Sequence, residues 1–198
     1  MKRSKKAIVG LAISALGTLC LGFGFAKPVE VSATTDTAWL ENGASVRYLG
    51  EGNGLRFTMQ IAESAFDENA TYGILIAPED YLTEGKELTV ANVFGENAIY
   101  NWAVMTESGW QYTKEDGKKQ IVNLVTSEFN SDKVNGVAVK EFYASLVDIL
   151  EANIAREFRA VGYIRTGEEG AYAYEFVGDD DNVRSMAYVA QKAIEDTG

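Results

Sequence analysis

A strict alternation of apolar and polar side chains is the feature that most constrains the fold of this chain. In the segment 55–61, LRFTMQI, every second residue is apolar, and Arg56, Thr58 and Gln60 lie between them. This period belongs to a β-strand with one buried and one exposed face. The glycine-rich segment 50–54 (GEGNG) separates it from another β-rich segment, 44–49 (ASVRYL). We therefore expect an antiparallel hairpin.

Strand patterns recur along the rest of the chain. We expect strands at 72–77, 98–106, 110–113, 120–126, 157–165 and 171–177. The first of these is apolar on both faces, which is typical of a central strand, and the turn-like segment 166–170 (TGEEG) joins the last two as a second hairpin. About eight short strands indicate a mainly β protein, an antiparallel β-sandwich of jelly-roll-like form.

Helical spacing occurs in two places. Val183, Met186, Ala187, Ala190 and Ile194 form one apolar stripe, preceded by Asp181 or Asn182 as N-cap. This predicts a C-terminal α-helix that covers a sheet face or an open end of the sandwich. Phe142, Leu146 and Ile149 also show helical spacing, so we expect the segment 137–152 to begin as a strand and continue as a short helix.

The first 33 residues have the composition of a secretory signal peptide. A basic start, MKRSKK, precedes an uncharged segment at 7–26, and small residues at Val31-Ser32-Ala33 place cleavage after Ala33, with Ala26 as the alternative. An uncleaved anchor is the other interpretation, because 7–26 is about long enough to span a bilayer. We expect a leader at 1–33, a single domain at 34–198, and a secreted protein without membrane insertion after cleavage.

Composition excludes several functional classes. The 198 residues include no histidine and one cysteine, Cys20, which lies in the expected leader. Histidine-dependent nucleophiles, histidine metal ligands and internal disulfides are therefore absent. With 29 acidic and 18 basic residues, the formal net charge is −11, which argues against nucleic acid and anionic lipid as partners.

Four segments resemble a known but uncharacterised module. They are GASVRYLGEGNGLRF (43–57), YGILIAPEDYL (72–82), FRAVGYIRT (158–166) and RSMAYVAQKA (184–193). In this order they resemble a module that recurs in secreted, often multidomain, proteins of anaerobic Gram-positive gut bacteria. The resemblance implies a secreted bacterial module and assigns no catalytic residue.

An aromatic group is the first candidate ligand site. Tyr100 and Trp102 share one face of an expected strand, and Trp110 and Tyr112 share one face of the next, with Asn101 and Gln111 nearby as hydrogen-bonding groups. Paired rings on a sheet face can stack a sugar, with amides holding its hydroxyls. The competing interpretation is that these rings fill the sandwich core.

Charged residues give weaker candidates. A glycosidase needs two facing carboxylates, and Glu175 and Glu63 stand out only because they lie in or at the end of apolar strands. The run Asp179-Asp180-Asp181-Asn182 is oxygen-rich, but EF-hand spacing fails, so helix capping is favoured over calcium binding. Arg47, Arg56, Arg159, Arg165 and Arg184 are expected to pair with acids on the sheet faces; a site for a carboxylate ligand is the alternative.

These observations favour a secreted, non-catalytic binding or cell-surface interaction module. Carbohydrate is the first ligand class, no cofactor or metal is expected beyond the calcium alternative, and the partner is a glycan or a cell-surface protein. A carboxylate-based glycan hydrolase is the second hypothesis. A structural or protein-interaction domain is the third.

Overall fold

The computed structural model describes residues 29–31, 37–41, 43–48, 53–106, 109–112, 117–178 and 182–197. Apart from 29–31, the expected leader lies outside these residues. The strands are β1 Val29–Val31, β2 Ala38–Leu40, β3 Ser45–Tyr48, β4 Asn53–Ala62, β5 Thr71–Pro78, β6 Tyr100–Thr106, β7 Gly109–Tyr112, β8 Lys119–Thr126, β9 Asn130–Val134, β10 Val137–Val147, β11 Glu157–Thr166, β12 Ala173–Val177 and β13 Val183–Ser185. The α-helices are α1 Val90–Phe94 and α2 Met186–Thr197, and the 3₁₀ turns are η1 Glu63–Ala65, η2 Glu79–Tyr81 and η3 Glu151–Asn153.

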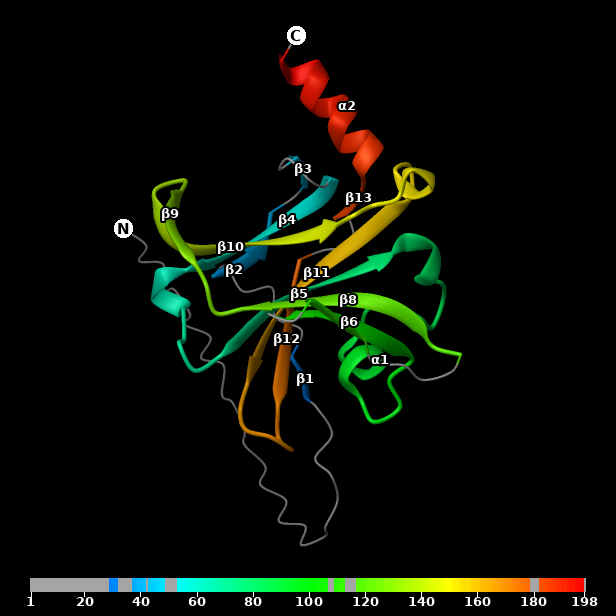
Figure 1. Ribbon diagram of the computed structural model, residues 1–198. Coiled ribbons are helices and arrows are strands. Elements are labelled where there is room, and N and C mark those ends of the chain that lie inside the picture. The colour runs from blue at the N-terminus through cyan, green and yellow to red at the C-terminus, as the bar shows by residue number, and fades with distance from the viewer. Residues whose placement is uncertain are drawn as a thin grey trace, which may run out of the picture.

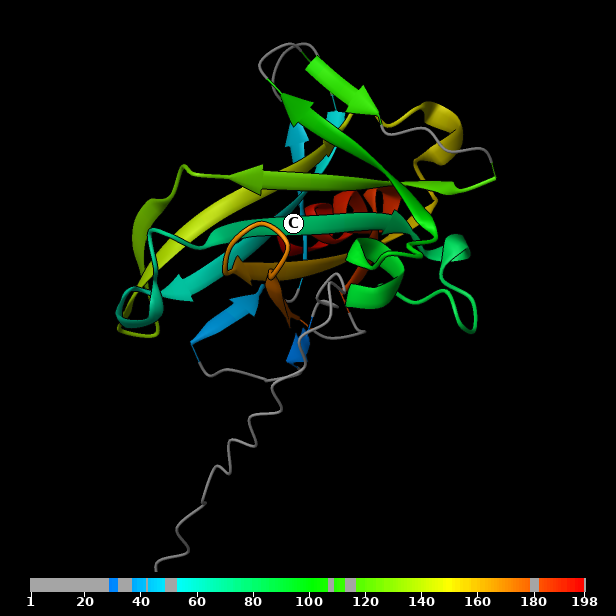
Figure 2. The same ribbon diagram turned by 90° about the horizontal axis from the view of Figure 1, so that it is seen from below.

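Two sheets pack face to face, so the expected β-sandwich with a C-terminal helix is confirmed. Sheet A has the order β1-β12-β11-β5-β8-β6-β7, with β13 also paired to β11, and sheet B has the order β2-β4-β10-β9, with β3 also paired to β4. Figure 1 shows sheet B above sheet A, with α1 below sheet A and α2 at the top. In the view from below, α2 and sheet B lie behind sheet A (Figure 2).

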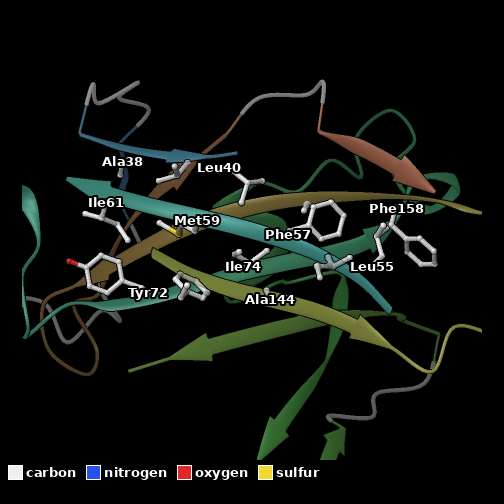
Figure 3. Close-up of a cluster of buried hydrophobic side chains, with 14 of the residues drawn as sticks. Ala38, Leu40, Leu55, Phe57, Met59, Ile61, Tyr72, Ile74, Ala144 and Phe158 are labelled. Atoms are coloured by element: carbon white, nitrogen blue, oxygen red, sulfur yellow. The ribbon is translucent and has the colours of Figure 1, made fainter. Parts of the chain in front are cut away.

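The main core lies between the sheets. The alternation first noted in 55–61 is the inner face of β4, where Leu55, Phe57, Met59 and Ile61 have no exposed surface. They meet Ile74 of β5 and side chains from β10, β11 and β2 (Figure 3). Each such buried side chain stabilises the fold by about 1.5–3 kcal/mol, so this layer dominates stability.

A second core covers the outer face of sheet A. It joins Leu75 and Ala77 of β5 to Val90 and Val93 of α1, together with rings from β6, β11 and β12. Thr89 caps α1, since its hydroxyl accepts a hydrogen bond from the backbone N–H of Asn92 at 3.2 Å. Segment 79–99 thus closes one side of the sandwich, which explains why β5 is apolar on both faces.

Most strand predictions are confirmed. β3 and β4 form the first hairpin, with Ser45 opposite Arg56, and β11 and β12 form the second. β5 is central in sheet A, between β11 and β8. Two pairings, β1 with β12 and β6 with β8, are parallel, so the sheet is not wholly antiparallel as expected.

The helix predicted within 137–152 is wrong. β10 is one strand of 11 residues, followed only by the 3₁₀ turn η3. Phe142, Ala144 and Leu146 alternate onto the main core, and this two-residue period outweighs the helical spacing. β9, which the sequence analysis missed, precedes it through a two-residue turn in which Asn135 and Gly136 have φ of 50° and 82°. This is the type I′ turn that favours hairpins.

The C-terminal helix begins later than expected and docks through other residues. Val183 belongs to β13, and Ser185 caps α2, since its hydroxyl accepts from the N–H of Tyr188 at 3.2 Å. Val189 is buried and Met186 packs on the main core, whereas Ile194, expected in the buried stripe, is 72% exposed. Only the first turns are held, because the helix extends beyond the sandwich (Figure 1).

Candidate functional site

The structure places two of the aromatic residues singled out from the sequence, Tyr100 and Trp102, in the second core. Tyr100 is buried, and its hydroxyl donates to the carbonyl of Lys86. Trp102 is half-buried and belongs to the edge of the second core. Asn101 is buried, and Gln111 is exposed on β7. The side chains of Trp110 and Tyr112 lie outside the described part; their backbones pair with those of Met105 and Ala103.

The packing of Trp102 depends on Phe94 of α1. The Phe94 ring stacks on Tyr174 at 4.2 Å between centroids and meets Trp102 edge-on at 5.0 Å and Tyr163 at 5.1 Å. The Tyr163 ring in turn packs directly over Gly73, where a Cβ would collide with it. Tyr100 and Trp102 therefore pack in the second core, not in the core between the sheets. That they bind a ligand stays a prediction.

The other sequence candidates lie apart from one another. Glu63 lies 3.6 Å from Lys140 as a surface ion pair, and Glu175 is half-buried on β12 with partners. Of the acidic run, 179–181 lies outside the described residues, and Asn182 donates from Nδ2 to the carbonyl of Glu41 at 3.1 Å. Within the described ranges, no group of three acidic or cysteine side chains is placed to hold a metal ion.

One side of the sandwich is open because β10 and β8 extend beyond the strands β9 and β6 that pair with them. In the described ranges, β9 pairs with β10 only as far as Glu141, and β6 pairs with β8 only as far as Asn123. The two-residue turn sets the register of the hairpin, so every second residue of β10 from Val137 directs its N–H and C=O toward the β9 side. Beyond Glu141 these are Tyr143, Ser145 and Val147, whose backbone groups lie on an unpaired edge.

Two hollows line this open side. One, of about 510 Å³, is bounded by Phe66, Glu68, Ala70, Thr71, Tyr72, Val125, Thr126, Ser127 and Phe129. The other, of about 280 Å³, is bounded by Leu124, Val125, Thr126, Phe142, Tyr143, Ala144, Ser145 and Val147. They share Val125 and Thr126 of β8, so they adjoin, and we call them together the open-side groove. Its volume is in the range of small-molecule sites.

Rings and hydroxyls dominate the groove. Phe66 stacks on Tyr72 at 5.2 Å between centroids, and Phe129 meets both edge-on. The Tyr72 hydroxyl accepts from the N–H of Asp67 at 2.9 Å, and burial raises the pKa of this phenol above its usual value. Thr71 Oγ1 accepts from Arg165 Nη2 at 2.9 Å, which fixes that hydroxyl at the rim. The groove thus has a rigid aromatic end.

At the other end, a row of polar side chains crosses the outer face of sheet B. Trp39 donates from its indole to Gln60, whose Nε2 donates to Glu141 Oε2 at 2.6 Å. The Tyr143 hydroxyl donates to the other oxygen of Glu141, and this bond, more than burial, raises the pKa of Tyr143. Glu141 is only 6% exposed, while Tyr143 is 45% exposed. A buried carboxylate therefore holds an exposed ring at the lip of the groove.

Arg56 completes this row. Its guanidinium carbon lies 4.9 Å from the centre of the Tyr143 ring. The register places Arg56 between Ser45 of β3 and Ser145 of β10. We call Arg56, Tyr143, Ser45 and Ser145, with Glu141 behind them, the Tyr143 site.

The sequence analysis named Arg56 among the arginines but did not bring it together with Tyr143 and Glu141, for two reasons. Arg56 was expected to pair with an acid, whereas its described contact is with the Tyr143 ring, and Gln60 in the polar half of 55–61 was not considered as a site residue. Glu141 and Tyr143 fall in the segment that was expected to become helical. The available signal was the polar face of β4, because two neighbouring strands must meet it with their own outward side chains.

No family model, no curated protein and no solved structure matches the chain. None of the helices in the described part is both long and apolar enough to cross a membrane.

Proposed function

We propose that the protein is a secreted, non-catalytic binding module for carbohydrate, and that the ligand lies in the open-side groove against Tyr143. The observation that carries this proposal is an exposed ring fixed by a buried carboxylate at the lip of an aromatic groove. A fixed ring stacks a sugar at little entropic cost, because it is already ordered. The basic and apolar start of the sequence supports secretion.

The composition of the groove supports binding rather than hydrolysis. The lining mixes apolar residues with Thr126, Ser127 and Ser145, which suits the mixed faces of a pyranose ring. Glycoside hydrolysis requires two carboxyl groups about 5–9.5 Å apart across the bond. The described lining includes one carboxylate, Glu68, and Glu141 is occupied by Gln60 and Tyr143.

A polysaccharide pull-down with ring variants tests the proposal. Tyr143→Ala is expected to lose most binding to the polysaccharide that the wild type retains, since it removes the stacking ring. Tyr188→Ala is the matched control, because Tyr188 is 51% exposed on α2 and outside the groove lining. We expect this variant to bind as the wild type does.

Trp102→Ala separates the two candidate locations. The initial aromatic hypothesis places the ligand at Trp102, whereas the groove proposal does not. Binding that is lost in Trp102→Ala and kept in Tyr143→Ala, with both variants folded by circular dichroism, contradicts the groove. Wild-type protein that retains none of a panel of neutral and acidic polysaccharides contradicts carbohydrate as the ligand.

A further inference from the structure

Arg56 donates no hydrogen bond within the described part of the chain. We infer that the Tyr143 site binds a carboxylate group of the ligand, and that the bound carbohydrate therefore contains uronic acid. This inference rests on the proposed carbohydrate function and narrows its ligand class. The structure describes the side chains of Arg56, Arg156, Arg159, Arg165 and Arg184.

Two of these arginines already hold carboxylates of the chain. Arg159 donates from Nε and Nη2 to the two oxygens of Glu79 at 2.9 and 2.6 Å. Arg156 does the same with Asp80, from Nε at 3.0 Å and from Nη2 at 2.9 Å to the second oxygen. Such two-bond pairing is the geometry that a planar guanidinium favours.

Arg165 and Arg184 are also satisfied, though differently. Arg165 donates to Thr71 and lies over the Tyr172 ring, with its guanidinium carbon 4.3 Å from the ring centre. Arg184 donates from Nη1 to the carbonyl of Val183 at 2.6 Å. Every arginine in this set except Arg56 therefore donates at least one hydrogen bond within the described part of the chain.

Arg56 is the exception. Its Nε is buried and has no hydrogen-bond partner, and its described contact is with the face of Tyr143. In a chain with 29 acidic and 18 basic residues, acids are in excess, yet none in the described ranges pairs with this guanidinium. Because no acceptor in the described part of the chain is bonded to its terminal amino groups, a bound carboxylate can accept hydrogen bonds from them.

The surroundings of Arg56 favour a carboxylate on a small ligand. Nε is covered while the residue as a whole is half-buried, so a ligand meets the terminal amino groups, which offer two parallel donors. Ser45 and Ser145 flank it on the neighbouring strands and supply hydroxyls. Glu141 accepts from the Tyr143 hydroxyl, whereas the guanidinium of Arg56 lies over the ring of Tyr143.

The test compares two ligands with the same sugar backbone, one with free carboxylates and one with them esterified. Calorimetric titration uses trigalacturonic acid and its trimethyl ester, and the net charge of −11 works against the acid at long range, so a preference for the acid reports a local contact. Wild-type protein is expected to bind the acid at least about tenfold more tightly than the ester, which corresponds to about 1.4 kcal/mol. Arg56→Gln is expected to bind both equally.

Two further variants secure the interpretation. Arg56→Lys keeps the charge but loses the two parallel donors of the guanidinium, so the preference for the acid is expected to fall at least threefold. This variant also replaces Arg56→Gln in the test if Arg56→Gln fails to fold. Arg156→Gln is the matched control, because its fork is filled by Asp80, and it is expected to keep the full preference.

The outcomes separate this inference from the proposed function. Equal wild-type affinity for acid and ester, or a preference that persists in Arg56→Gln, overturns the carboxylate inference while sugar binding stands. Tighter binding of glucose 6-sulfate than of glucuronic acid overturns it in favour of a sulfate site. Failure of the wild type to bind any of these sugars or a neutral polysaccharide overturns both.

Discussion

The outer faces of the two sheets differ in how far their aromatic rings are covered. Sheet A carries more rings, but α1 and Phe94 cover them and turn that face into a second core. Sheet B carries fewer rings, but its Tyr143 is 45% exposed and is held in place by a buried acid. The better candidate for a ligand site is therefore the face with an exposed ring held in place, not the face with more rings.

Removing the ring of Phe94, which covers the outer face of sheet A, should have the largest effect on stability. Phe94→Ala deletes four ring contacts, so we expect a loss of about 3–4 kcal/mol in the free energy of unfolding, measured in urea. Tyr188→Ala should change stability by less than about 0.5 kcal/mol. A Phe94→Ala protein as stable as the Tyr188→Ala protein would mean that sheet A is not closed by α1.

Alkaline titration distinguishes a buried phenol on sheet A from an exposed one on sheet B. Burial raises the pKa of Tyr163 from 10.0 to about 12, although its hydroxyl bonds to Asn123 at 3.0 Å. Between pH 10 and 12 the unfolded chain loses this proton while the folded chain keeps it, so stability falls by about 2–3 kcal/mol.

The measurement is the slope of the free energy of unfolding against pH between pH 10 and 12. Tyr163→Phe should flatten it, whatever its stability at neutral pH, and Tyr143→Phe should flatten it less, because Tyr143 is 45% exposed and its pKa is raised mainly by one hydrogen bond rather than by burial. Equal slopes for wild type and Tyr163→Phe would contradict burial of this phenol.

The smallest expected effect concerns the acid behind Tyr143. Glu141→Gln replaces an acceptor with a donor that faces Gln60 or Tyr143, at a cost of about 1–2 kcal/mol. The pKa of Tyr143 should fall, since the bond to Glu141 is the main cause of its rise; the difference in phenolate absorbance between variants with and without Tyr143 reports it. Glu63→Gln, at a surface ion pair, should leave both quantities nearly unchanged.

Local pattern predicted the sandwich well and the site poorly. The β3–β4 and β11–β12 hairpins follow from alternation and turn residues that are close in sequence. The contacts of Phe94 with β6, β11 and β12 join segments far apart along the chain, so no local period reveals that Trp102 is covered. Arg56 and Glu141 likewise meet Tyr143 only after β4 and β10 pair.

The unpaired edge of β10 also affects how copies of the protein behave toward one another. Free N–H and C=O groups at Tyr143, Ser145 and Val147 can template a strand from a second molecule. Asp148, with a left-handed φ of 57°, ends the edge at once, and the net charge of −11 keeps copies apart. Because salt shortens the range of that repulsion to about 8 Å at physiological ionic strength, resistance to self-association in this protein depends on charge and weakens as salt rises.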